Sequence, residues 1–112
     1  MNSKLNILWT NADPVTAELM VMMYARNSLA RGWWESVQII IWGATTKLIA
    51  ENETIRKKLL ELQSNGIEIN ACLVCAEELG VADKLKESGI SVKKMGLPLT
   101  EILKSEEKLI TV

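Results

Sequence analysis

The sequence contains no histidine among its 112 residues. Histidine is the commonest general base and the commonest metal ligand in proteins, and it activates the nucleophile in Ser-His and Cys-His catalytic pairs. Most hydrolase mechanisms are therefore excluded within one chain. Cysteine is scarce as well: Cys72 and Cys75 alone cannot complete a four-ligand zinc site unless carboxylates or neighbouring subunits contribute. We expect no resident metal and no other cofactor.

The chain also lacks an excess of charge and a long hydrophobic run. Its 13 Lys and Arg are balanced by 14 Asp and Glu, a net charge of −1, so we expect no nucleic-acid partner. The longest strictly apolar stretch, Leu19–Ala25, is too short to span a membrane. The N-terminus shows no basic segment followed by a long apolar run, as a secretory signal would. We expect a cytoplasmic protein without a membrane partner, whose thiols are reduced unless they are in use.

The length and composition are those of one soluble domain. Hydrophobic residues make up 48% and charged residues 24% of the sequence, close to the globular average. A chain of this length can bury one substantial core and no second one. We therefore expect a single domain over residues 1–112.

The apolar pattern predicts strands and helices that alternate along the chain. Strands are expected at Leu5–Trp9, Val37–Trp42, Ile67–Ala71, Ile90–Val92 and Leu109–Val112. Helices are expected at Pro14–Arg31, after Gly43–Thr46 with a break near Asn52–Glu53 and a stop at Asn65–Gly66, at Cys72–Ser88 with a pause at Gly80, and at Pro98–Lys108. Such alternation requires right-handed crossovers and a sheet covered by helices on both faces. The predicted fold is a three-layer α/β/α sandwich with a five-stranded, mostly parallel sheet.

In an open parallel sheet, ligands and reactive groups gather at the carboxyl ends of the strands. Here that edge includes Cys72–Cys75 and four candidate pocket-lining residues: Asn11, Gly43, Thr45 and Gly96. The segment around Gly43 can bind a small anion through its backbone N–H groups, or it can be a simple turn. Asp13, directly before Pro14, is expected to cap a helix rather than to act as an acid.

Cys72 is the candidate catalytic residue because it stands where the third strand passes into a helix. Backbone N–H groups and the helix dipole favour a thiolate there, whereas Glu77 and Glu78 oppose one, so we expect modest activation. Cys72 and Cys75 also form a C-x-x-C motif in the setting where dithiol redox pairs occur. Cys75 can alternatively be a small hydrophobic residue of the core.

The segment Leu19–Ala25 is apolar on every face of its predicted helix, which a lone surface helix would not be. Burial against another subunit explains this pattern, and Trp33 and Trp34 can anchor the same interface. The alternative is that neighbouring elements of the same chain enclose the helix.

The chain resembles the small single-domain branch of the DsrE/DsrF/TusD-like family over nearly its whole length. The resemblance is carried by Cys72 at a strand end, by Gly80-Val81 eight residues later, and by the stretch Met95–Glu101, which contains Met-Gly-Leu-Pro-Leu-Thr. It implies a flavodoxin-like fold and assembly into trimers or hexamers.

The resemblance also implies a persulfide chemistry. In the sulfur-relay members, a cysteine at the position of Cys72 accepts and passes on a persulfide sulfur, from a donor protein or to an acceptor protein. The sequence therefore leaves three hypotheses for the function: a sulfur relay centred on Cys72, a Cys72/Cys75 dithiol redox or sensing module, and a non-catalytic oligomeric binding protein.

Overall fold

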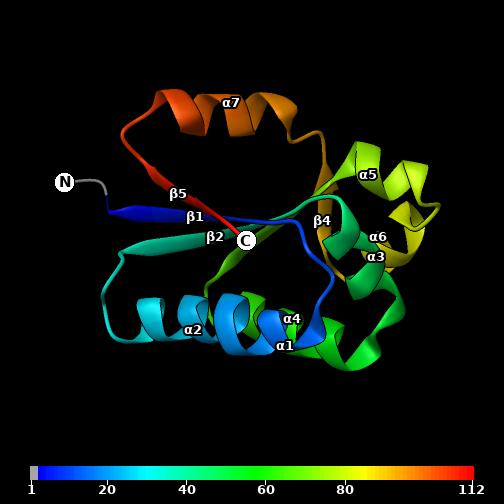
Figure 1. Ribbon diagram of the computed structural model, residues 1–112, viewed down its shortest axis with the longest axis horizontal. Coiled ribbons are helices and arrows are strands. Elements are labelled where there is room, and N and C mark those ends of the chain that lie inside the picture. Colours follow the sequence, from blue (N-terminus) through cyan, green and yellow to red (C-terminus); the bar gives the residue numbers. More distant parts are fainter. Residues whose placement is uncertain (1–2) are drawn as a thin grey trace.

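The computed structural model describes residues 3–112 and contains one five-stranded sheet (Figure 1). The strands are β1 (Lys4–Trp9), β2 (Ser36–Ile41), β3 (Glu68–Cys72), β4 (Ser91–Lys93) and β5 (Lys108–Thr111). Their order across the sheet is β4-β3-β2-β1-β5, and every pairing between neighbours is parallel. The predicted α/β sandwich is confirmed, and the sheet that was expected to be mostly parallel is parallel throughout.

The helices are α1 (Pro14–Thr16), the π-helix η1 (Ala17–Met22), α2 (Met23–Ala30), α3 (Ala44–Glu51), α4 (Glu53–Ser64), α5 (Leu73–Glu78), α6 (Ala82–Glu87) and α7 (Gly96–Lys104). Figure 1 shows α1, α2 and α4 below the sheet, α7 above it, and α3, α5 and α6 beyond one end of the strands. No helix within residues 3–112 is long and apolar enough to cross a membrane.

Local side-chain caps place several helix ends where the sequence predicts them. The Asp13 carboxylate accepts a hydrogen bond from the Thr16 backbone N–H at 3.1 Å, and Pro14 occupies the first helical position. The Asn52 side chain accepts from the Ile55 N–H at 3.0 Å, which starts α4 directly after α3 ends. The predicted break at Asn52–Glu53 is therefore confirmed, with its physical cause.

Helix α7 differs from its prediction, which placed it at Pro98–Lys108. It begins at Gly96, because a proline is tolerated in the first turn of a helix, where its missing N–H is not needed. It ends at Lys104, because the Ser105 hydroxyl donates to the Ile102 carbonyl at 2.7 Å and accepts from the Glu107 N–H at 3.0 Å. Lys108 consequently begins β5.

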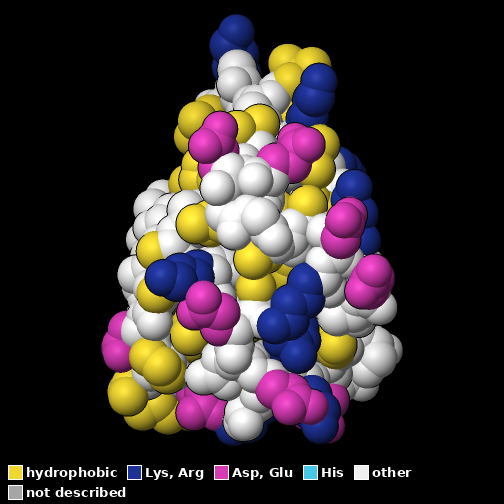
Figure 2. Space-filling model, turned by 90° about the vertical axis from the view of Figure 1, so that its right-hand side faces the viewer, with side chains coloured by type: hydrophobic (Ala, Val, Ile, Leu, Met, Phe, Trp, Pro, Cys, Tyr) yellow, Lys and Arg dark blue, Asp and Glu magenta, His cyan; other side chains and the backbone are white. Residues whose placement is uncertain are grey.

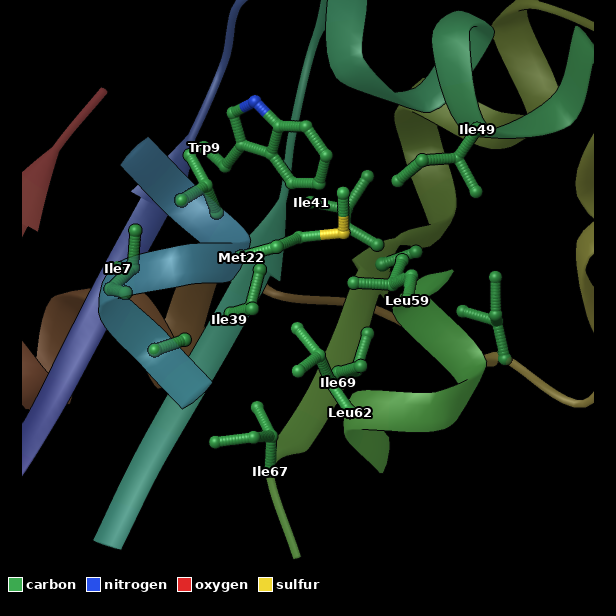
Figure 3. Close-up of a cluster of buried hydrophobic side chains, with 14 of the residues drawn as sticks. Ile7, Trp9, Met22, Ile39, Ile41, Ile49, Leu59, Leu62, Ile67 and Ile69 are labelled. Carbon is green, nitrogen blue, oxygen red and sulfur yellow. The ribbon is translucent and has the colours of Figure 1, made fainter. Parts of the chain in front are cut away.

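The lower face of the sheet carries the larger core (Figure 3). Alternate strand residues point toward this face, and they pack against side chains from the helices that cover it. The labelled members are Ile7, Trp9, Ile39, Ile41, Ile67 and Ile69 from the sheet side and Met22, Ile49, Leu59 and Leu62 from the helices. Because Ile7, Ile39 and Ile41 are completely buried, this face holds the strands in place through apolar burial.

The upper face of the sheet is half polar. Its apolar cluster is small, and beside it three buried carboxamides run across adjacent strands. Asn70 Nδ2 donates to Gln38 Oε1 at 2.7 Å, and Gln38 Nε2 donates to Asn6 Oδ1 at 2.7 Å. We call Asn6, Gln38 and Asn70 the amide ladder. Asn6 Nδ2 in turn donates to Glu107 Oε1 at 3.0 Å, so the ladder connects β3 to the segment before β5.

We expect Gln38→Leu to lower the free energy of unfolding by about 1–3 kcal/mol, because leucine leaves Asn6 Oδ1 and Asn70 Nδ2 each without one hydrogen bond in a buried setting. Urea denaturation measures the change. The matched control is Gln63→Leu, which removes a single surface hydrogen bond to the Gly89 carbonyl and should cost less than about 0.5 kcal/mol. Equal losses of unfolding free energy in the two variants would show that the amide ladder stabilises the fold no more than a surface hydrogen bond does.

Candidate functional site

Cys72 is the last residue of β3, and α5 begins at the next residue. This is the strand-to-helix position that the sequence predicts. The side chain points to the upper face of the sheet, where it packs with Ile40, Met95 and Ile102. Only 3% of Cys72 is exposed. Within a single chain, the thiol singled out by the sequence is therefore enclosed by apolar side chains.

Cys75 lies one helical turn after Cys72 and packs against the same apolar cluster. It is half-buried and lines a hollow of about 450 Å³ together with Gly43, Ala44, Val74 and Leu79, while Lys47 and Glu78 add the charged side chains of its wall. This hollow lies at the end of the molecule formed by α3 and α5. Figure 2 shows that end face, where hydrophobic side chains are exposed among charged ones.

Gly43 positions a backbone N–H that donates to a thiol. Its φ of +68° is a left-handed conformation that glycine adopts without strain, and it stands directly before α3. In this conformation its N–H donates to Cys75 Sγ at 3.4 Å. A hydrogen bond of this kind favours the thiolate over the thiol.

The pKa of the Cys75 thiol is nevertheless raised. Burial is the largest cause, the adjoining Cys72 thiol adds to it, and the Gly43 N–H opposes it. Cys75 is therefore a protonated thiol at neutral pH, and its nucleophilic form increases as the pH rises into the alkaline range.

Lys93 is a neighbour of Cys72 that sequence reasoning missed. It pairs with Cys72 across β3 and β4, and paired residues of a parallel sheet point to the same face. Val92, the residue before it, packs into the larger core on the opposite face. Cys72 and Lys93 are 21 positions apart in the sequence. Only the pairing of β3 with β4 therefore reveals that a lysine lies beside Cys72.

The four residues expected to line a pocket do not line a common pocket in the structure. Gly43 lines the hollow beside Cys75. Thr45 is completely buried instead, because its hydroxyl bridges the Trp9 and Asn11 carbonyls at 2.8 and 2.9 Å. Asn11 accepts the Asp13 N–H at 3.2 Å as part of the turn before α1, and Gly96 opens α7 at the surface. Thr45 is thus a structural tie between β1 and α3.

Over residues 3–112, His, Cys, Asp and Glu do not gather in any group of three or more that could hold a metal ion. Two thiols, those of Cys72 and Cys75, lie close together at this edge of the sheet.

No protein-family model matches the chain, and no curated protein matches it. The solved structure of the conserved protein of unknown function BT1422 from Bacteroides thetaiotaomicron is similar throughout, with 46% sequence identity, a TM-score of 0.95, and coverage of 99% of this chain and 96% of that chain. The chain belongs to the same family as BT1422. The structure of the protein of unknown function MTH1491 from Methanobacterium thermoautotrophicum has a TM-score of 0.77 at 18% identity, covering 98% of this chain and 99% of that chain, and it shares the fold.

We expect iodoacetamide to alkylate Cys75 at least about tenfold faster than Cys72 in the folded protein, because only Cys75 borders an open hollow. A free cysteine is half ionised at about pH 8.5. Because the pKa of Cys75 is raised, its alkylation rate should still increase above that pH. In Cys72→Ala the profile should move to lower pH, since the neighbouring thiol helps to raise the pKa. Peptide mass spectrometry of samples quenched at timed intervals measures both rates.

The control is the same reaction in guanidinium, where both cysteines should react equally. Equal reactivity of Cys72 and Cys75 in the folded protein would contradict the burial described above.

Proposed function

We propose that the protein handles sulfane sulfur through its two cysteines, and that Cys75 is the point of entry. The observation that carries this proposal is a thiol in an open apolar hollow, held by the Gly43 N–H and packed against the cluster of a second, buried thiol. The resemblance assigns the relay to the position of Cys72. The burial of that residue favours a route in which sulfur reaches Cys75 first.

The transfer needs no cofactor and no net oxidant. The Cys75 thiolate attacks the outer sulfur of a donor persulfide; a bond forms between Cys75 Sγ and that sulfur, and the donor leaves as a thiolate. The Cys72 thiolate can then attack the same outer sulfur, which moves the persulfide to Cys72 and regenerates the Cys75 thiolate. Each step exchanges one S–S bond for another.

A dithiol function is the second candidate, and the adjacency of the two thiols favours it. If the Cys72 thiolate attacks the inner sulfur, Cys75 Sγ, the outer sulfur leaves as hydrosulfide and a Cys72–Cys75 disulfide forms. The dithiol is then oxidised, the sulfane sulfur is reduced to sulfide, and a dithiol reductant is required for another cycle.

The two candidates predict different products after incubation with a cysteine desulfurase and cysteine. We expect an adduct of about 32 Da on Cys75 or Cys72 in the wild-type protein, on Cys75 in Cys72→Ala, and none in Cys75→Ala, as measured by peptide mass spectrometry with fragment ions that locate the added sulfur. A loss of about 2 Da from the peptide that contains both Cys72 and Cys75, together with released sulfide, would instead assign the dithiol function.

Absence of any adduct and of any disulfide, in protein whose Cys75 reacts normally with iodoacetamide, would refute both candidates. The third function, a non-catalytic binding protein, would then be the one to pursue.

We also propose that the protein forms a homo-oligomer, a trimer or hexamer, through the Leu19–Ala25 segment. Support comes from apolar side chains that the chain itself leaves uncovered: Leu19 is 62% exposed and Met23 is 38% exposed, and Val15 is exposed one turn earlier. Met20 is exposed as well, whereas Val21, Met22 and Ala25 of the same segment are buried in the core and Tyr24 is half-buried. One row of the helix therefore serves the core, and a second row is left for another subunit.

We expect Leu19→Lys to convert the oligomer to a monomer, because a charge in an apolar interface loses its hydration without gaining a partner. Sedimentation velocity measures the state. Leu103→Lys, at an equally exposed leucine of α7, is the matched control and should leave the oligomer intact. A wild-type monomer, or an oligomer that survives Leu19→Lys, would rule out this interface.

A further inference from the structure

A second cavity, of about 300 Å³, lies between α7 and the polar half of the upper sheet face. It is separate from the hollow beside Cys75, with which it shares no lining residue. Its floor is formed by strand residues that include Lys4, Gln38 and Lys93, and its other wall by α7 residues that include Glu101 and Ile102. Its volume is at the lower end of the range found for small-molecule sites.

The floor of this cavity is rigid and polar. Gln38 is 4% exposed, and its carboxamide is fixed from both sides, since its oxygen accepts from Asn70 and one of its N–H groups donates to Asn6. Within residues 3–112, Gln38 Nε2 has no acceptor besides Asn6 Oδ1, so its second N–H is available to a molecule in the cavity that Gln38 lines.

The charged side chains around the cavity fall into two sets. At the β1 end, Lys4 Nζ lies 3.5 Å from Glu68 Oε1 and 3.9 Å from Glu107 Oε1, so these charges compensate one another. Lys93 on β4 and Glu101 on α7 make no ion pair with each other or with any other residue of the described chain. One unpaired cation and one unpaired anion therefore border the same cavity from opposite elements.

From this arrangement we infer that the cavity binds a small zwitterion, a molecule of amino-acid size that carries one carboxylate and one ammonium group. Its carboxylate is held by the Lys93 ammonium and the second N–H of Gln38, and its ammonium by the Glu101 carboxylate. Each charge of the ligand then has a partner of opposite sign, and the fixed amide gains its missing acceptor.

Other ligand classes fit this cavity less well. Three glutamates and two lysines line it, so a ligand with negative charge alone would meet excess repulsion. An apolar ligand would remove water from Gln38, Lys93 and Glu101 without replacing their hydrogen bonds. Because Met95 lines the cavity and also packs with Cys72, a bound molecule would lie next to the wall that covers the buried thiol.

Isothermal titration calorimetry with L-alanine, L-serine and L-cysteine as probes tests the inference. We expect at least one of them to bind with a dissociation constant below about 1 mM, whereas propionate and propylamine, which each carry one of the two charges, should bind at least about tenfold more weakly. Lys93→Met and Glu101→Gln should each weaken binding by about tenfold or more.

Lys94→Met and Glu106→Gln are the matched controls, since both residues are exposed nearby and neither lines the cavity. They should bind as the wild type does, and circular dichroism should show all four variants folded. Three results would each overturn the inference. They are no heat of binding from any of the zwitterions up to about 10 mM, binding of propionate as tight as that of the zwitterions, and binding by Lys93→Met as tight as that by the wild type. Because these measurements need neither cysteine, the result is independent of the proposed sulfur chemistry.

Discussion

The unequal covering of the two faces of the parallel sheet determines the rest of this structure. Parallel sheets are stable when helices cover both faces, and here α1, α2 and α4 cover the lower face, whereas the upper face has only the nine residues of α7. The lower face is accordingly apolar, and most of its side chains are buried. The upper face carries both the amide ladder and the small cluster around Cys72, so the polar and reactive groups of the protein gather on the side that has one helix.

The same asymmetry gives the two cysteines different surroundings although they are three residues apart. Cys72 is the last residue of a strand, so its side chain points to one face of the sheet, where it packs against Met95 and Ile102. Cys75 belongs to a helix beyond that edge and borders a hollow beside Gly43. The proposed sulfur transfer depends on this difference, because it assigns receipt of the sulfur atom to the accessible thiol and storage of it to the buried one.

Sequence predicted most of the architecture because each strand and helix has a local signal. The break at Asn52 and the start at Asp13 depend on caps that are visible in the sequence, and the β-branched run in β2 is typical of a strand covered on both faces. The end of α7 was missed because it depends on hydrogen bonds of the Ser105 side chain. The π-helical turns of η1 were missed because an apolar run such as Leu19–Ala25 suits either helix geometry.

The candidate site was predicted less completely than the fold. Placement of Cys72 at the end of β3 follows from the sequence, but its burial depends on which face α7 covers, and its neighbour Lys93 depends on the order of strands. The cavity under α7 combines residues from β1, β2, β3, β4 and α7, so no sequence window contains its pattern.

The amide ladder has a direction. Hydrogen-bond donation runs from Asn70 to Gln38 to Asn6 and terminates on pure acceptors, the Glu107 carboxylate and the Lys108 carbonyl. Turning over any single carboxamide would set oxygen against oxygen or NH₂ against NH₂ in a medium of low dielectric constant. A shift of β2 relative to both β1 and β3 would break the hydrogen bonds of Gln38 to Asn6 and to Asn70. The one-way chain of amides therefore adds a polar requirement to the alignment of β1, β2 and β3, beyond the register that burial of the apolar face already specifies.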